Sequence, residues 1–359
     1  MTKNRHDHAD RTRRVVESWP SRRNVAENPY QALFSEALES AGWSVHEFSV
    51  SSLFRRADVW HWHWPDLQVS RKSRTESLFR AAMLAAFVMW AHSRGTSVVW
   101  SVHNVRSHDQ QHPRLELRFF RWFTAHLDGV HYLSQANKIE AESAYPSLQS
   151  IPSIVIPHGS YPRSGDSGSS VEARKQLGIR PDARVVSFVG RIRAYKGIDQ
   201  LLAAFEHRRD AELHLVIGGA PEDEVISRIS RLSRRDPALR SFLHHLSDSE
   251  MSRILTASDV VILPYLTSGN SGTAMLALSS NRPILVPDHP SMLDLRDAIG
   301  PRWIRLFHPP LTSAALEGSI SDLPIGSPNL DAFEWKTLAH QYSAWYEHIE
   351  VRRRGLSRP

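Results

Sequence analysis

Cysteine is absent from this 359-residue chain, which excludes disulfides, thiolate metal sites and cysteine nucleophiles. Long apolar stretches are absent as well: the longest, residues 81–91, is shorter than the roughly 20 residues that a membrane-spanning helix requires. The polar start, MTKNRHDHADRTRR, has no apolar centre and is unlike a signal peptide. We therefore expect a cytoplasmic protein.

Positive charge is in excess. Lys and Arg number 44 against 38 Asp and Glu, which gives a formal net charge of +6 and a sequence pI near 9.7. Such a balance suits phosphorylated small molecules, an anionic membrane or nucleic acid. No RNA- or DNA-binding motif accompanies the basic residues, so we expect no nucleic-acid partner.

The length suits two α/β cores. In the first half, strands of the buried type alternate with amphipathic helices and short loops, which is typical of a doubly wound parallel sheet. The expected strands are 14–19, 43–50, 58–64, 97–102, 129–133 and 153–157, and the expected helices are 30–40, 73–93 and 115–125.

The segment SGDSGSS, residues 164–170, has the composition of a linker. The alternation then restarts, with expected strands at 184–190, 212–218, 259–264 and 283–287 and expected helices at 197–207, 225–234 and 274–280. We therefore predict an α/β protein of two Rossmann-like domains that face a cleft at the carboxyl ends of their strands. The predicted division is a tail (1–13), an N-terminal domain (14–163), the linker, a C-terminal domain (171–330), and a final helix with a basic tail (331–359).

The second half carries a basic loop directly after a strand, in VVSFVGRIRAYKGIDQLLAAF, residues 185–205. The strand ends at Gly190, Arg191 and Lys196 follow, and Gly197 opens a helix. Arg offers a fork of donors to phosphate oxygens, and Lys adds a mobile point charge. The loop is therefore a candidate diphosphate site, although a solvated basic loop would have the same sequence.

A Gly-rich loop stands at the start of a later helix, in LPYLTSGNSGTAMLALSS, residues 263–280. Free backbone N–H groups at a helix N-terminus bind anions, whereas a simple capped turn is the alternative. The loop residues that we expect to bind phosphate are Ser268, Gly269, Asn270, Ser271, Gly272 and Thr273.

The order of these motifs resembles that of the group 1 retaining glycosyltransferases, which are family 4-like and have the GT-B fold. The resemblance covers roughly residues 14–350 and includes NPYQ at 28–31, SVHN at 101–104, VIPHG at 155–159 and the final FEW…AWY helix. It implies that this final helix crosses back to the first domain.

The resemblance also implies roles for individual residues. Arg191 and Lys196 would bind the diphosphate of a nucleotide-sugar donor, and residues 268–273 would bind its phosphate or sugar through their backbone. His103 would lie beside the transferred sugar as a catalytic residue. Three further residues would line the cleft on the acceptor side: Asn28, Asn104 and His158.

This chain departs from the family in one respect. The family usually carries two glutamates eight positions apart around the Gly-rich loop, and the corresponding places here are Ser268 and Leu276. Some bacterial exopolysaccharide mannosyl- and glucuronosyltransferases of the GT-B type also lack the pair, and the Ser-Gly loop resembles theirs more closely. The stereochemical outcome therefore does not follow from the resemblance.

An unusual aromatic segment, DVWHWHWPD, occupies residues 58–66. In a strand the three tryptophans share one face and the two histidines share the other, so the indoles either stack on sugar rings or fill the core. Trp64 is our candidate for an acceptor contact. Asp66, just past the strand, is our candidate for the catalytic base that deprotonates the acceptor hydroxyl.

These observations predict a hexosyltransferase that moves a sugar, with GDP-mannose as the favoured donor, to a lipid-linked or soluble glycan in polysaccharide or glycoconjugate biosynthesis. The chain has no Asp-x-Asp triplet of the kind that holds a metal in sugar transferases of the other common fold, so we expect neither metal nor cofactor. The alternative is a non-catalytic nucleotide-sugar or glycan binding protein. The helix at 73–93, with basic residues at its start, is either an ordinary buried helix or a peripheral contact with the inner face of the cell membrane.

Overall fold

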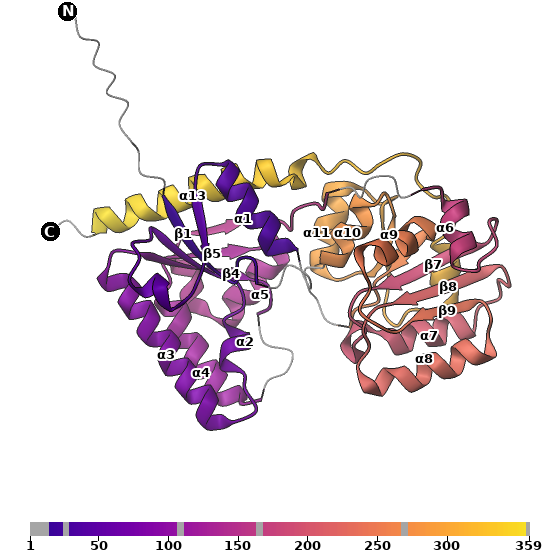
Figure 1. Ribbon diagram of the computed structural model, residues 1–359, viewed down its shortest axis with the longest axis horizontal. Coiled ribbons are helices and arrows are strands. Elements are labelled where there is room, and N and C mark those ends of the chain that lie inside the picture. The colour runs from indigo at the N-terminus through magenta and orange to yellow at the C-terminus, as the bar shows by residue number, and fades with distance from the viewer. Residues whose placement is uncertain (1–13, 24–28, 106–110, 163–167, 267–271, 357–359) are drawn as a thin grey trace, which may run out of the picture. The chain divides into compact units, whose positions relative to one another are not determined.

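The computed structural model describes residues 14–23, 29–105, 111–162, 168–266 and 272–356 (Figure 1). The chain forms two compact units. The first unit comprises residues up to Leu133, Lys138–Ile156 and the segment from Trp335 onward, and the second comprises Ser134–Asn137 and Pro157–Glu334. Each unit contains one six-stranded sheet.

The first sheet has the order β2-β1-β3-β4-β5-β6, and every pairing is parallel. Parallel strands covered on both faces are apolar along most of their length, which explains why the sequence predicted them well. The strands are β1 (Val15–Trp19), β2 (Ser44–Glu47), β3 (Val59–Trp62), β4 (Ser97–Val102), β5 (Gly129–Tyr132) and β6 (Ser153–Val155).

Strand β3 directs its side chains alternately to two cores, as its sequence predicted. Trp60 and Trp62 pack with α3 (Arg74–Ser93) and α4 (Pro113–Ala125), whereas Val59 lies in the opposite core. His61 also lies on the opposite face, where it contacts α1 (Tyr30–Ser40) and the C-terminal helix α13 (Trp335–Leu356). His61 is therefore buried between the sheet and two helices.

The C-terminal helix α13 belongs to the first unit, as predicted, and is yellow in Figure 1. It contributes Leu338, Tyr342, Trp345, Tyr346 and Ile349 to the core that it shares with α1. Gly129 of β5 allows this close packing, because an added Cβ would lie 2.9 Å from the Trp345 ring and would overlap Ile349. The helix therefore completes the core of a unit whose other elements end at residue 156.

The second sheet has the order β12-β11-β10-β7-β8-β9, again with parallel pairings throughout. One face carries α7 (Ile198–Glu206), α8 (Asp223–Arg235) and α12 (Ser313–Gly318), and the other carries α6 (Ser170–Gln176), α9 (Asp248–Ala257), α10 (Gly272–Ser279) and α11 (Pro290–Ile299). The strands are β7 (Arg184–Val189), β8 (Leu213–Gly218), β9 (Leu239–Phe242), β10 (Val260–Ile262), β11 (Ile284–Pro287) and β12 (Ile304–Phe307).

Several predicted strands are shorter in the structure, and two of them are followed by helical turns. The strand expected at 43–50 ends at Glu47, and a 3₁₀ helix, η1 (Val50–Leu53), follows it. The strand expected at 58–64 ends at Trp62, because Pro65 cannot donate to a sheet and its φ of −64° suits a helix start. Trp64 therefore lies outside the strand, and Asp66 begins a short helix.

Several elements were not predicted from the sequence. They are α2 (Asp66–Val69), α5 (Gln135–Ala144), η2 (Pro146–Ser150), η3 (Ala194–Lys196) and η4 (Asp331–Phe333), together with α6, β9, α9, α11, β12 and α12. A search of the described residues finds no helix with both the length and the apolar character that a membrane crossing demands.

Candidate functional site

The basic loop and the start of α10 meet in the second unit. A Cβ added at Gly190 would lie 3.4 Å from Thr273 Oγ1 and 3.8 Å from Lys196 Nζ. Gly190 has a φ of +107°, so glycine suits this position on conformational grounds as well. The Lys196 ammonium group and the N-terminus of α10 therefore lie close together at the end of β7, although they are more than 70 positions apart in sequence.

Glycine also positions Lys196. The adjacent Gly197 has a φ of +73°, and any side chain there would overlap the carbonyl group of Pro264, which follows β10. Lys196 is half-buried, with its Nζ 5.3 Å from the centroid of the Tyr265 ring. Arg191, in the same loop, is exposed. We call Lys196, Gly190 and the Gly272–Thr273 start of α10 the phosphate corner.

His158 and Tyr161 also border the phosphate corner. A Cβ on Gly272 would lie 3.1 Å from both His158 Nε2 and Tyr161 Oη. Burial lowers the pKa of His158 to about 4, so the ring is neutral at neutral pH. His158 Nδ1 donates to the carbonyl of Gly159 at 2.8 Å, which leaves Nε2 as an acceptor. His158, which we expected on the acceptor side, thus belongs to the second unit, and Tyr161 was not singled out from the sequence.

The first unit contains a buried hydrogen-bonded chain across three strands. His61 on β3 contacts the Tyr346 hydroxyl at 2.5 Å through Nδ1 and the Ser101 hydroxyl on β4 at 2.6 Å through Nε2. Ser101 in turn contacts Nδ1 of His131 on β5 at 2.6 Å, and His131 Nε2 lies 2.8 Å from the carbonyl oxygen of Ile156. The chain therefore joins α13 to the sheet.

The direction of this chain follows from its last member. A carbonyl oxygen only accepts, so His131 donates through Nε2 to Ile156. Because burial lowers the pKa values of both histidines, each ring is neutral and carries one hydrogen. Ser101 therefore donates to His131, His61 donates to Ser101, and Tyr346 donates to His61.

A second histidine pair reaches the surface. His63 Nδ1 lies 3.1 Å from Nε2 of His103, which follows β4, and the Trp64 ring stacks on His103 at 4.2 Å. His103 is partly exposed, whereas His63 is buried. Trp64 thus contacts His103, the predicted catalytic residue. Of the two roles considered for the tryptophans, Trp60 and Trp62 have the core role.

Asp66 begins α2 and is 7% exposed. Burial raises the pKa of its carboxyl from 3.8 to about 6, with a smaller contribution from Glu116, while backbone N–H groups at the helix start oppose the rise. A carboxyl group with a pKa near the working pH is suited to general base catalysis.

The first unit contains an aromatic cavity of about 230 Å³. Its lining includes the residues on both sides of Asp66 in the sequence. The lining residues are Trp19, Pro20, Arg23, Trp62, Trp64, Pro65, Leu67 and Gln68. Indole faces pack well on the apolar faces of sugar rings, so the cavity can hold a saccharide.

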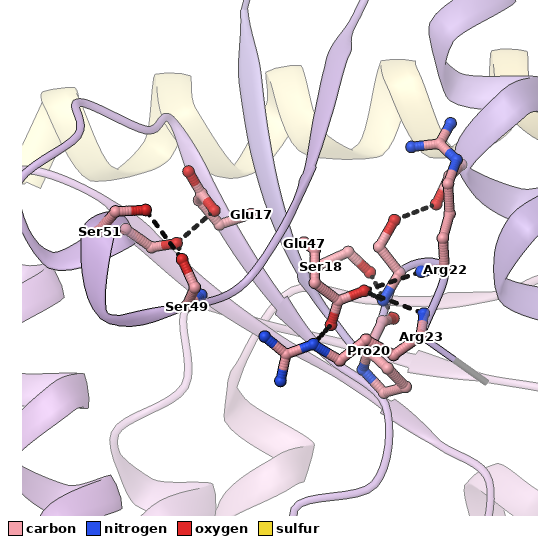
Figure 2. Close-up of polar contacts among 11 residues, drawn as sticks. Glu17, Ser18, Pro20, Arg22, Arg23, Glu47, Ser49 and Ser51 are labelled. Atoms are coloured by element: carbon pink, nitrogen blue, oxygen red, sulfur yellow. Dashed lines mark hydrogen bonds and ion pairs between the residues drawn. The ribbon is translucent and has the colours of Figure 1, made fainter.

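One rim of the aromatic cavity is fixed by Glu47. Figure 2 shows its carboxylate accepting the backbone N–H groups of Arg22 and Arg23, and Ser21 donates to it as well, at distances of 2.8 to 3.3 Å. The guanidinium of Arg23 lies 3.6 Å from the same carboxylate. The turn after β1 is therefore held at the end of β2.

Comparison with known proteins shows what this chain is similar to. Residues 169–298, which include the phosphate corner, match the family model described as glycosyl transferases group 1. Two relatives named GDP-mannose:glycolipid 4-beta-D-mannosyltransferase, both from Xanthomonas campestris pv. campestris, are 26% and 28% identical over 90% of this chain and 89% of their own length. This chain is a glycosyltransferase with a segment that matches the group 1 family.

Solved structures agree on the fold of this glycosyltransferase. Sucrose-phosphate synthase from Thermosynechococcus elongatus superposes with a TM-score of 0.64 over 96% of this chain and 98% of its own, at 16% identity. Anabaena HepE, solved in complex with UDP, has a TM-score of 0.61 over 94% of this chain and 98% of its own, at 12% identity. The predicted GT-B architecture is confirmed.

Some predicted site residues of the glycosyltransferase lie outside the described ranges, namely Asn28, Ser268, Gly269, Asn270 and Ser271. Asn104 is described and is partly exposed after β4. Across residues 14–23, 29–105, 111–162, 168–266 and 272–356, no group of three or more His, Asp or Glu side chains is placed to hold a metal ion.

We expect the glycosyltransferase to lose stability in mild acid because of the buried histidine chain. His131 has a pKa of about 4 when folded and 6.5 as its ordinary value, so the unfolded state binds more protons between these values. Its contribution is complete above pH 6.5 and falls as the pH drops toward 4, by roughly 3 kcal/mol in total. Urea denaturation across this range measures it, and His131→Gln, which keeps an N–H donor toward Ile156, should flatten the dependence. Equal slopes in both proteins would contradict this account.

Proposed function

We propose that this glycosyltransferase transfers mannose from GDP-mannose to a glycolipid, with inversion and without a metal ion. The observation that carries the proposal is the phosphate corner, where Lys196 and the start of α10 meet within the region that matches the family model. The likeness to the two mannosyltransferases over 89% of their length supports the choice of sugar, nucleotide and acceptor.

Cationic and backbone groups supply the electrostatics in this proposal. As the glycosidic bond breaks, negative charge grows on the departing diphosphate. Lys196 and the N–H groups at the start of α10 stabilise this charge because they are already in place. Arg191, exposed in the same loop, would bind a second phosphate. These groups fill the role that a divalent ion has elsewhere.

We place the deprotonation of the acceptor hydroxyl in the first unit. The two relatives are named as 4-beta-D-mannosyltransferases, and a sugar that leaves an α-linked diphosphate reaches the β configuration through attack from the opposite face. Such attack requires a base for the acceptor hydroxyl. Asp66 is the candidate, and the aromatic cavity of the same unit would hold the acceptor sugar.

A donor screen tests the proposal. GDP-mannose and GDP should raise the melting temperature, because a ligand at 100 times its Kd adds about 2.7 kcal/mol to the free energy of unfolding, and UDP-glucose should raise it less. Release of GDP should require added glycolipid acceptor and should persist in EDTA. Stabilisation by UDP-sugars alone, or complete loss of turnover in EDTA, would contradict the donor or the metal-free mechanism respectively.

We also propose that α3 rests on an anionic membrane where the glycolipid is presented. Leu78 and Met89, like Phe79 and Trp90, are 11 residues apart and so share one side of the helix, and all four are exposed. Phe54 of the adjoining loop is 77% exposed, and Trp90 is tied to that loop by a hydrogen bond to Leu53. Basic residues adjoin these elements in the sequence: Arg55 and Arg56 follow Phe54, and Lys72 and Arg74 lie at the start of α3.

Vesicle flotation should distinguish this surface from a merely solvated helix. The protein should bind vesicles containing phosphatidylglycerol and bind phosphatidylcholine vesicles weakly. Lys72→Glu with Arg74→Glu should reduce binding more than tenfold, since each basic residue near the surface contributes about 1 kcal/mol. Ile325→Ser, which replaces a 97% exposed apolar residue of the second unit, is the matched control. Equal binding to both vesicles would rule out the electrostatic contact.

A further inference from the structure

One side-chain amide of the second unit joins three segments of the chain near the end of β10. Gln200 of α7 donates through Nε2 to the carbonyl oxygen of Pro264 at 2.6 Å, and its Oε1 accepts the backbone N–H of Leu311 at 2.8 Å. Pro264 and Leu311 are 64 and 111 positions from Gln200 in the sequence. Because a carbonyl oxygen only accepts and a backbone N–H only donates, both partners require the same orientation of the amide.

The Pro264 carbonyl group lies against Gly197, the residue that follows Lys196. A Cβ added to Gly197 would overlap this carbonyl group and would lie 2.6 Å from Gln200 Nε2. Pro264 is buried, and the Gln200 amide is the one donor to its carbonyl oxygen among the described residues. A buried carbonyl group without a donor is costly. The contact between Pro264 and Gly197 therefore depends on Gln200.

The same peptide group also leads to the aromatic ring beside Lys196. The Tyr265 ring centroid lies 5.3 Å from Lys196 Nζ, and the Pro264 carbonyl group lies in the plane of the peptide bond that joins Pro264 to Tyr265. A rotation of this carbonyl group would thus move the chain on both sides of the lysine.

We propose that Gln200 is a positioning residue for Lys196. By fixing the Pro264 carbonyl group against Gly197, it keeps the lysine ammonium group at the phosphate corner. The effect of Gln200 on turnover rests on the proposed glycosyl transfer, whereas its coupling to Lys196 does not.

Binding of inorganic pyrophosphate to the full-length protein tests this coupling, because the probe contains neither a sugar nor a nucleoside. Gln200→Met keeps the approximate length of the side chain and removes both hydrogen bonds. In calorimetry it should weaken pyrophosphate binding about tenfold, the effect of losing one well-placed hydrogen bond from a charged group. In a Lys196→Ala background the same substitution should change the dissociation constant less than twofold, because Gln200 acts through the lysine.

Ser258→Ala is the matched control for a loss of stability alone. The buried Ser258 hydroxyl donates to Ser187 and to the Ile254 carbonyl in the core of the same unit. Its removal should lower the melting temperature and leave pyrophosphate binding unchanged. If Gln200→Met does not fold, Gln200→Asn takes its place, since its amide is one methylene group too short to reach both partners.

Two results would overturn the proposal, and they differ in what else they remove. Equal weakening by Gln200→Met with and without Lys196, or no weakening in either background, would refute the positioning role and leave the phosphate corner in place. Pyrophosphate binding that is absent, or that does not depend on Lys196, would remove the phosphate corner itself.

Discussion

Replacing Lys196 by alanine should reduce turnover by two to three orders of magnitude, which is roughly the cost of removing one preorganised group that stabilises transition-state charge. The lysine Nζ approaches Gly190 and the start of α10, where a diphosphate would be held. The folded state should change little, because Lys196 is half-buried and its contact with the Tyr265 ring contributes about 0.5–1 kcal/mol. Initial rates of GDP release, together with thermal denaturation, measure both effects.

Arg193→Ala is the matched control for this experiment. It removes a cation from the same loop, but Arg193 lies 3.4 Å from Glu222 and forms an ion pair with it. Its activity should therefore stay close to that of the wild type. If Lys196→Ala retains full activity, or if both variants lose the same amount, the phosphate corner does not stabilise the leaving group as proposed.

Asp66→Asn should remove most of the turnover and at the same time stabilise the fold. A rise of the carboxyl pKa from 3.8 to about 6 corresponds to ~3 kcal/mol lost on burying the charged form at neutral pH. An amide of the same shape avoids this cost and can still accept the backbone N–H groups at the start of α2. General base catalysis contributes about 10²–10⁴-fold to rates, so kcat should fall within that range.

The pH profile separates this role from a structural one. In the wild type, kcat/KM for the acceptor should rise with pH through about 6, as the carboxyl group loses its proton. Asp66→Asn should lack that limb, and calorimetric binding of the donor to it should be unchanged. A variant that keeps the acid limb, or that loses stability and activity together, would show that Asp66 is not the base.

Local periodicity was sufficient for most of the fold. Strands such as β4 and β7 are buried along nearly their whole length, so their apolar runs stood out between polar flanks. The alternation of Trp60 and His61 correctly predicted that they lie on opposite faces of the strand. The predicted strand ran on to Trp64, whereas β3 ends at Trp62, and α2 was missed because a helix of four residues is too short to show a period.

The sequence predicted those parts of the site that lie within a single loop. Lys196 and Gly272 were identified through their loops, but no local pattern shows that Gly190 brings them together. The buried chain from Tyr346 to His131 depends on lateral contacts between β3, β4 and β5 and on a helix nearly 300 positions away. Ser101, which links two of its histidines, is an ordinary strand serine in the sequence.

The place of α13 has a consequence for how the chain is made. Its residues Leu338 to Ile349 complete the first core, yet they are translated after the whole second unit. Until α13 has been translated, Phe34 and Leu38 of α1 lack the helix against which they pack, whereas all elements of the second unit have been made. The second unit can therefore complete its fold before the first unit does. The core of the first unit is complete only when α13 packs on it.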